Sequence, residues 1–192
     1  MLHIKEEKCI YDNHFVIDEA VIAHTDNHGN TATFKRMKLQ RQDAAVVFVY
    51  NTESRKVILT RQFRYAIAAK TKAPILEIVA GKVDGEEEPV QTAFREVEEE
   101  VGYRVKKENM QFICSFFASP GYSSEKFHFY HATVKNEDKG SRGGGLKQEN
   151  EYIEIVEMDY NAFIQLVDEN QIEDAKTLIA ALHIKLHNNY QL

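Results

Sequence analysis

The sequence predicts an α+β fold in which a small N-terminal antiparallel sheet, residues 1–40, precedes a larger domain, residues 41–192. Stretches typical of strands recur along the chain between turn residues, and three later segments carry apolar residues at helical spacing. The chain has 192 residues, of which 43% are hydrophobic, so it is long enough to bury a substantial core. We therefore expect one compact protein with a small appended subdomain.

Three strand-like stretches make up the first 40 residues, and they are Ile4–Tyr11, Phe15–His24 and Thr31–Leu39. The segment from Asp26 to Asn30 has turn chemistry and joins the second stretch to the third. The region has too few apolar residues to be stable alone. We therefore expect it to pack on the rest of the chain or on a second copy.

The larger domain begins with a continuous apolar run, Ala44–Tyr50, which is typical of a strand buried on both faces. Further strand-like stretches follow at Lys56–Phe63, Ile75–Val79, Met110–Phe117, Lys126–Val134 and Glu151–Met158. Two C-terminal segments, Asp159–Glu169 and Asp174–His187, have helical patterns. The polar segment 136–150 contains three consecutive glycines, and connections this long are uncommon unless they are functional or disordered.

A further helix is predicted from Pro89 to Val101. Proline suits a first helical turn, acidic residues precede it, and Gly102 is a typical terminating residue. At about 100° per residue, one face of this helix carries apolar residues, which are Val90, Ala93, Phe94, Val97 and Val101. We expect this face to pack against a core.

Three glutamates, Glu96, Glu99 and Glu100, share one side of the same helix, because their spacing is i, i+3 and i+4. Like charges at this spacing destabilise an isolated helix by roughly 0.2–0.5 kcal/mol per pair. Either solvent screens these charges, as on an ordinary acidic helix face, or a cation compensates them. Clustered carboxylates are the hard oxygen ligands that Mg²⁺ prefers, particularly when substrate phosphates complete its shell.

Composition excludes several classes of protein. The 30 acidic residues outnumber the 24 Lys and Arg, for a formal net charge of −6, which disfavours nucleic acid as a partner. There is no apolar run of the roughly 20 residues that a membrane span needs, and no apolar N-terminal leader, so we expect a cytoplasmic protein with no membrane partner. Cys9 and Cys114 match no metal-binding spacing, and we expect both to be buried and reduced.

The residues around the predicted helix form a longer motif. It reads G-x5-E-x7-R-E-U-x-E-E-x-G-U, where U is a bulky apolar residue, and it is made by Gly81, Glu87, Arg95, Glu96, Val97, Glu99, Glu100, Gly102 and Tyr103. If each of the seven polar or glycine positions matched at roughly one in ten, the set would arise by chance about once in 10⁷ windows. The pattern resembles the Nudix box, with Tyr103 as a mild departure from the usual aliphatic residue.

The resemblance implies the Nudix fold, a mixed β-sheet sandwiched between helices, and a site for divalent cations that bridge a diphosphate. By their places in the motif, Glu96 and Glu100 would be the principal Mg²⁺ ligands, with Mn²⁺ as a substitute ion. Glu99 would be an additional ligand or a supporting catalytic carboxylate, and the carbonyl of Ala80 a backbone ligand. The remaining motif residues would be structural, namely Gly81, Glu87, Arg95 and Gly102.

Beyond the box, the chain is similar to the nucleoside-diphosphate-sugar branch, the ADP-ribose and GDP-mannose pyrophosphatases. The similarity rests on the N-terminal sheet, Arg61–Arg64, Ser119–Gly121 and the late acidic segment Glu149–Ile153. It implies an intertwined homodimer in which residues 1–40 contribute to dimerisation and to substrate contacts. The arginines that would meet the substrate diphosphate are Arg36 and Arg64. Arg41 is a further candidate, and it fits equally well as an ordinary surface arginine.

The late acidic segment would supply the catalytic base of the reaction. Glu149 is the first choice and Glu151 the auxiliary ligand or base, although the two assignments are interchangeable on the sequence. The three glycines at 143–145 would be flexible and would let the segment close over substrate, with a disordered loop as the alternative.

The function implied is hydrolysis of a nucleoside diphosphate sugar, GDP-mannose or ADP-ribose, to a nucleoside monophosphate and a sugar phosphate. The triple glycine favours the GDP-mannose subgroup. Two alternatives stay open: a non-catalytic nucleotide-sugar sensor that kept the fold, and a Nudix hydrolase of other nucleotides such as nucleoside triphosphates. Intact Glu96, Glu99 and Glu100 argue against the sensor.

Overall fold

The computed structural model describes residues 1–71, 74–146, 148 and 150–187. They form the α+β fold that the sequence predicts. Contacts divide the chain into two units: Met1–Asp43 together with Phe116–Phe127, and Ala44–Ser115 together with the chain from His128 onward. Within the described residues, no helix has the length and the apolar character that a membrane crossing requires.

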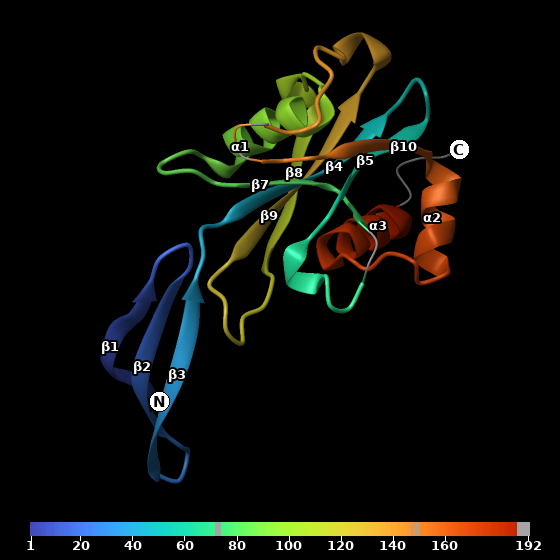
Figure 1. Cartoon of the computed structure of the whole chain (residues 1–192). Coiled ribbons are helices and arrows are strands. Elements are labelled where there is room, and N and C mark those ends of the chain that lie inside the picture. Colours follow the sequence, from blue (N-terminus) through green and yellow to red (C-terminus); the bar gives the residue numbers. More distant parts are fainter. Residues whose placement is uncertain (72–73, 147, 149, 188–192) are drawn as a thin grey trace. The chain divides into compact units, whose positions relative to one another are not determined.

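The first unit contains an antiparallel sheet with the strand order β1-β2-β3 (Figure 1). Its strands are β1 (Leu2–Asp12), β2 (Val16–Thr25) and β3 (Thr31–Gln40), within two residues of the predicted bounds. The turn between β2 and β3 forms because the Asp26 carboxylate accepts hydrogen bonds from the amides of His28 and Asn30. The segment Phe116–Phe127 is bound to the sheet of this unit, since the amide of Leu39 donates to the carbonyl of Tyr122 at 2.7 Å.

The second unit is built on a sheet in which the described strands follow the order β10-β5-β4-β9-β8, with β6 paired to β5 and β7 paired to β4. The strand bounds are β4 (Ala44–Asn51), β5 (Lys56–Gln62), β6 (Ile75–Glu77), β7 (Val79–Lys82), β8 (Met110–Phe117), β9 (Lys126–Val134) and β10 (Glu154–Asp159). All residues of β4 are buried, as its continuous apolar run predicts.

Helices cover both faces of this sheet. The helix α1 (Pro89–Glu96) continues as a π-helical turn over Val97–Val101 and lies on one face, whereas α2 (Tyr160–Asp168) and α3 (Ala175–His187) lie on the other (Figure 1). On the α1 side, Ala93, Val97 and Val101 are fully buried in one cluster with alternate residues of β4. On the opposite side, Phe48 of β4 packs against Phe163 of α2, with ring centroids 5.9 Å apart.

The structure differs from the sequence prediction in several respects, and β10 begins at Glu154 rather than at Glu151. The strand expected over Ile75–Val79 is interrupted, because the amide of Ile78 donates to the Thr177 hydroxyl at 2.8 Å instead of to a neighbouring strand. The expectation that Cys9 and Cys114 are buried is wrong, since both are free and exposed. Each lies in a strand whose side chains are largely exposed in the single chain.

Candidate active site

The loop between β7 and α1 is held in place by the Arg95 side chain. Its Nη2 donates to Glu87 Oε2 at 3.4 Å and to the carbonyl of Lys82 at 3.3 Å. The Thr92 hydroxyl donates to the same Glu87 oxygen at 2.8 Å. These hydrogen bonds, the Thr92 bond first and then those of Arg95, outweigh burial and hold the pKa of Glu87 below its usual value. Glu87 and Arg95 thus tie the loop to the helix.

The same guanidinium also orients two of the clustered carboxylates. Arg95 Nη1 donates to Glu96 Oε1 at 2.6 Å and to Glu99 Oε2 at 2.9 Å. Charge-assisted hydrogen bonds of this length are strong and directional. Arg95 therefore holds the carboxylates of Glu96 and Glu99 on the same side of the helix.

Glu96 and Glu100 are buried against β7, where their residues are only 9% and 5% exposed. The amide of Ala80 donates to Glu100 Oε2 at 3.3 Å. Gly81 is required beside them, because a Cβ on its backbone would lie 1.9 Å from the carboxyl carbon of Glu96. The helix thus directs the carboxylates of Glu96 and Glu100 to the start of the loop. Only glycine fits beside them at position 81.

Burial makes these carboxylates hard to ionise. It raises the pKa of Glu96 to about 7, against the pull of Arg95, with the charges of Glu99 and Glu151 adding to the rise. Burial, followed by the charges of Glu96 and Glu151, also raises the pKa of Glu100 well above its usual value. Glu96, Glu100 and Glu151 therefore repel one another at this site, and a bound cation would relieve the repulsion.

The donor chemistry of the site fits a divalent cation such as Mg²⁺. Its oxygens are hard carboxylate ligands from Glu96, Glu99, Glu100 and Glu151, and Arg95 neutralises only part of their charge. Among the described residues, no three acidic, histidine or cysteine side chains already converge as a closed metal shell. A divalent ion such as Mg²⁺ usually keeps several waters and takes oxygens from substrate phosphates as well as from one or two carboxylates.

Comparison with known proteins assigns the family. A model of the NUDIX domain matches residues 40–181, which include the whole motif from Gly81 to Tyr103. The chain belongs to the Nudix family. As a Nudix domain it is a hydrolase, and the fold that the motif implies, a mixed sheet between helices, is the one present.

Individual relatives cover most of the chain. A GDP-mannose pyrophosphatase of Cronobacter sakazakii is 32% identical over 183 residues, which are 94% of this chain and 93% of the relative. A methanol dehydrogenase activator of Bacillus methanolicus is 35% identical over 157 residues, 82% and 80% of the two chains. A solved structure described as an ADP compounds hydrolase superposes with a TM-score of 0.73 at 19% identity and covers 97% of this chain and 92% of that one.

The glycine run at 143–145 joins the Nudix helix to Glu151. The amides of Gly144 and Gly145 donate to the carbonyls of Glu100 and Glu99 at 2.8 and 3.2 Å, and all three glycines have positive φ. A Cβ on Gly145 would lie 2.7 Å from Glu151 Oε2. The run is therefore packed against the end of the helix, with backbone conformations that favour glycine.

The structure brings some of the other predicted site residues into the second unit. Glu151 lies close enough to raise the pKa values of Glu96 and Glu100, after the larger contribution of burial to each. Arg64 binds Glu77 through two hydrogen bonds, from Nε at 2.7 Å and from Nη2 at 3.2 Å. Glu149, the first choice for the base, lies outside the described residues.

Arg36 and Arg41 belong to the first unit. Arg41 is already paired there, because its Nη2 lies 3.2 Å from Glu125 Oε1. Arg36 stacks on Phe34, with its guanidinium carbon 4.4 Å from the ring centroid, and no carboxylate of the described residues lies within ion-pair distance of it. Its Nη1 donates to the carbonyl of Lys35 at 3.0 Å, so of the two arginines Arg36 is the one without a carboxylate partner among the described residues.

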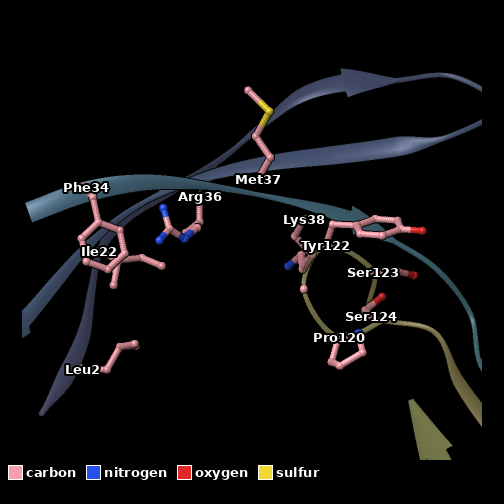
Figure 2. Close-up of a pocket in the computed structure, with 11 residues that line it drawn as sticks. Leu2, Ile22, Phe34, Arg36, Met37, Lys38, Pro120, Tyr122, Ser123 and Ser124 are labelled. Carbon is pink, nitrogen blue, oxygen red and sulfur yellow. The ribbon is translucent and has the colours of Figure 1, made fainter. Parts of the chain in front are cut away.

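Arg36 lies in a groove of about 530 Å³ within the first unit (Figure 2). One side of the groove is formed by β3, including Phe34 and Lys38, and the other by the segment Pro120–Ser124. Lys38 is held by Glu7 and Asp18 at 2.9 and 3.0 Å. The groove thus combines an unpaired cation with aromatic and hydroxyl groups, a combination that suits a polar, partly aromatic ligand.

Sequence reasoning missed one group of polar residues near the site. Glu77, Asp174, Lys176 and Thr177 form a buried network with Arg64. The only signal in the sequence is a glutamate inside the apolar strand segment Ile75–Val79, and nothing there identifies a lysine 99 residues later as its partner.

The raised pKa of Glu96 predicts how the stability of the metal-free protein depends on pH. The usual pKa is 4.5 and the folded value is about 7, so the folded state binds this proton more tightly. The stabilisation is fully present below 4.5 and is lost as the pH rises through about 7. At about 1.4 kcal/mol per pKa unit and about 2–4 °C per kcal/mol, the rise from 4.5 to about 7 corresponds to a change in Tm of roughly 7–14 °C.

The measurement is Tm against pH in a chelator, for the wild type and for Glu96→Gln. We expect the Tm of the variant to rise relative to that of the wild type between pH 5 and pH 7.5. A difference that is constant over this range would show that Glu96 titrates normally.

Proposed function

We propose that this Nudix hydrolase is a Mg²⁺-dependent pyrophosphatase that cleaves the diphosphate of a nucleoside diphosphate sugar. The products would be a nucleoside monophosphate and a sugar phosphate. The observation that carries the proposal is the pair of buried carboxylates, Glu96 and Glu100, whose charges no side chain fully compensates. GDP-mannose is the first candidate substrate and ADP-ribose the second, because relatives named GDP-mannose pyrophosphatase cover more than nine-tenths of the chain.

The cation would be held by Glu96 and Glu100, with Glu99 and the carbonyl of Ala80 as further ligands and Mn²⁺ as a substitute ion. When bound, it lowers the pKa of a coordinated water and neutralises charge on the diphosphate. Arg95 keeps the carboxylates oriented, and Gly81 leaves room for them. The carboxylates held in this way would bind the cation, and without the cation they would repel the anionic diphosphate.

The remaining residues would act on the water and on the diphosphate. Glu149 or Glu151 accepts the proton of the attacking water, and the amide of Leu146 supports Glu151 by donating to Oε2 at 3.1 Å. Arg64 and Arg36 are the arginines that would donate to the diphosphate, with Arg41 as the third candidate. Each phosphate oxygen would then meet a donor or the cation.

We further propose that the protein is a homodimer that associates through residues 1–40. Every residue of β1 is exposed in the single chain, and the exposed side chains include large apolar ones at Leu2, Ile4, Ile10 and Tyr11. An edge strand with this much apolar surface favours association with another chain.

The proposal is tested by phosphate-coupled hydrolysis with Mg²⁺ over GDP-mannose, ADP-ribose, other nucleotide sugars, diadenosine polyphosphates and nucleoside triphosphates. We expect cleavage of a nucleotide sugar that depends on the metal. Preferred cleavage of a nucleoside triphosphate would favour the alternative hydrolase. Metal-dependent binding of a nucleotide sugar without turnover would identify the protein as a sensor and reject the enzymatic proposal.

A further inference from the structure

A network of four charged side chains lies between β6 and the start of α3. At its centre is Glu77, which is only 2% exposed and which binds both Arg64 and the ammonium of Lys176. Lys176, itself 8% exposed, also donates to Asp174 Oδ1 at 2.8 Å. Two cations and two anions thus meet in one cluster, in which Glu77 and Lys176 are buried and the side chain of Arg64 is 43% exposed.

The network is ionised and locally anchored. Burial alone would raise the pKa of Glu77, but the hydrogen bond from Arg64 and the charge of Lys176 lower it below its usual value. Asp174 Oδ2 accepts hydrogen bonds from both the amide and the hydroxyl of Thr177, at 2.9 and 2.6 Å. Each charge therefore has a partner, as buried charges require.

The network also determines where the guanidinium of Arg64 lies. Arg64 precedes the 3₁₀ turn Tyr65–Ile67, and its two hydrogen bonds to Glu77 fix the plane of the guanidinium. Burial would lower the pKa of this group, but its hydrogen bonds to Glu77 and the charges of Glu77, Glu100 and Asp174 raise it. Glu77, to which the Nε and Nη2 of Arg64 are committed, lies three residues before Ala80, whose amide donates to Glu100 Oε2.

Lys176 balances the charge of this arrangement. With it, the cluster has two positive and two negative groups, so no surplus of negative charge surrounds the Arg64 guanidinium. Without it, Glu77 and Asp174 would leave one net negative charge, which would repel a diphosphate and draw the guanidinium inward. Burying an ion pair rarely gains stability over apolar side chains of similar volume, so stability alone is a poor explanation for this cluster.

We propose that Glu77 and Lys176 are positioning residues that hold the Arg64 guanidinium beside the carboxylate site, where it meets the substrate diphosphate. This inference rests on the proposed function. The competing explanation is that the cluster only fastens α3 to the sheet.

The test compares Lys176→Met with Lys185→Met, a control on the same helix. Lys185 pairs with Asp168 on α2, at the exposed surface. For the nucleotide sugar that the wild type cleaves, we expect Lys176→Met to raise KM by roughly 10- to 100-fold with kcat nearly unchanged, since a charge-assisted hydrogen bond to substrate is worth this much. Lys185→Met should match the wild type. Similar KM values for both variants would overturn the proposal.

A double-mutant cycle with Arg64→Ala separates positioning from fastening. If Lys176 acts through Arg64, the double variant should have the KM of Arg64→Ala alone. If the fold-changes in KM of the two single variants instead multiply in the double variant, Lys176 acts independently of Arg64 and the proposal is rejected. Glu77→Gln, which keeps the side-chain shape, is the second variant if Lys176→Met does not fold, and it should shift KM in the same direction.

A direct readout does not need turnover. In the wild type, the Arg64 Nε–H should exchange slowly with solvent in NMR spectra, because it donates to buried Glu77. Lys176→Met should speed this exchange at least tenfold, whereas Lys185→Met should not change it. If the wild type cleaved no nucleotide sugar, the proposed function would fail, and unchanged exchange in Lys176→Met would separately reject the positioning role.

Discussion

Glu100→Gln is expected to reduce kcat/KM by about a thousand-fold while the fold stays intact. Glutamine keeps the shape of the side chain but loses the negative charge that would bind the cation, and losses of about 10²–10³-fold are typical when one group that stabilises the transition state is removed. Calorimetric titration with Mn²⁺ should show weaker binding in parallel. Residual activity above one-tenth of the wild type would exclude Glu100 as a principal ligand.

The same substitution should raise the Tm of the metal-free protein. The charged form of Glu100 is disfavoured by burial and by its acidic neighbours, so a neutral amide at this position removes an unfavourable interaction. The matched control is Glu98→Gln, two residues away, where the carboxylate is half-exposed and pairs with Arg104 at 2.7 Å. We expect this control to keep wild-type activity and metal affinity.

Gly81→Ala is expected to lower kcat/KM by about 100-fold, because misplacing a catalytic group by about 1 Å has effects of this size. The added methyl group would lie 1.9 Å from both the Glu96 carboxyl carbon and its Oε1, so the Glu96 carboxylate must move. Overpacking of this kind also costs about 1–3 kcal/mol of stability. Assays of kcat/KM, Mn²⁺ affinity and Tm on the purified variant measure all three effects.

The control for this substitution is Gly85→Asn in the loop that follows. Gly85 has φ of 55°, which asparagine tolerates, and a Cβ there meets nothing within 4 Å. We expect the activity of this control to stay close to that of the wild type. Equal losses in the two variants would mean that the loop backbone, and not the position of Glu96, limits the reaction.

The sequence predicts the parts of this protein that depend on local patterns. Pro89 and Gly102 bound the Nudix helix as expected. Of its predicted apolar face, Ala93, Val97 and Val101 are buried, whereas Val90 in the first turn is 37% exposed. The motif also predicts which glutamates lie together. These features depend on residues a few positions apart, so periodicity and spacing are sufficient to find them.

Features set by distant contacts could not be predicted. The last turn of the helix is π-helical, and its carbonyls at Glu99 and Glu100 are bound by amides more than 40 residues later. The charged form of Glu77 is stable within an apolar strand segment because Lys176 on α3 pairs with it. No local pattern contains either partner, so tertiary packing overrides the local expectation at both places.

The glycine run at 143–145, which packs against the end of the Nudix helix, makes the site a single cooperative unit. Gly144 and Gly145 bind the carbonyls of Glu100 and Glu99, and Gly145 also packs against the Glu151 carboxylate. If this run detaches, the last helical turn loses its hydrogen-bond partners and Glu151 loses its support in the same event. Partial opening of the protein would therefore disassemble the carboxylate cluster as a whole rather than one side chain at a time.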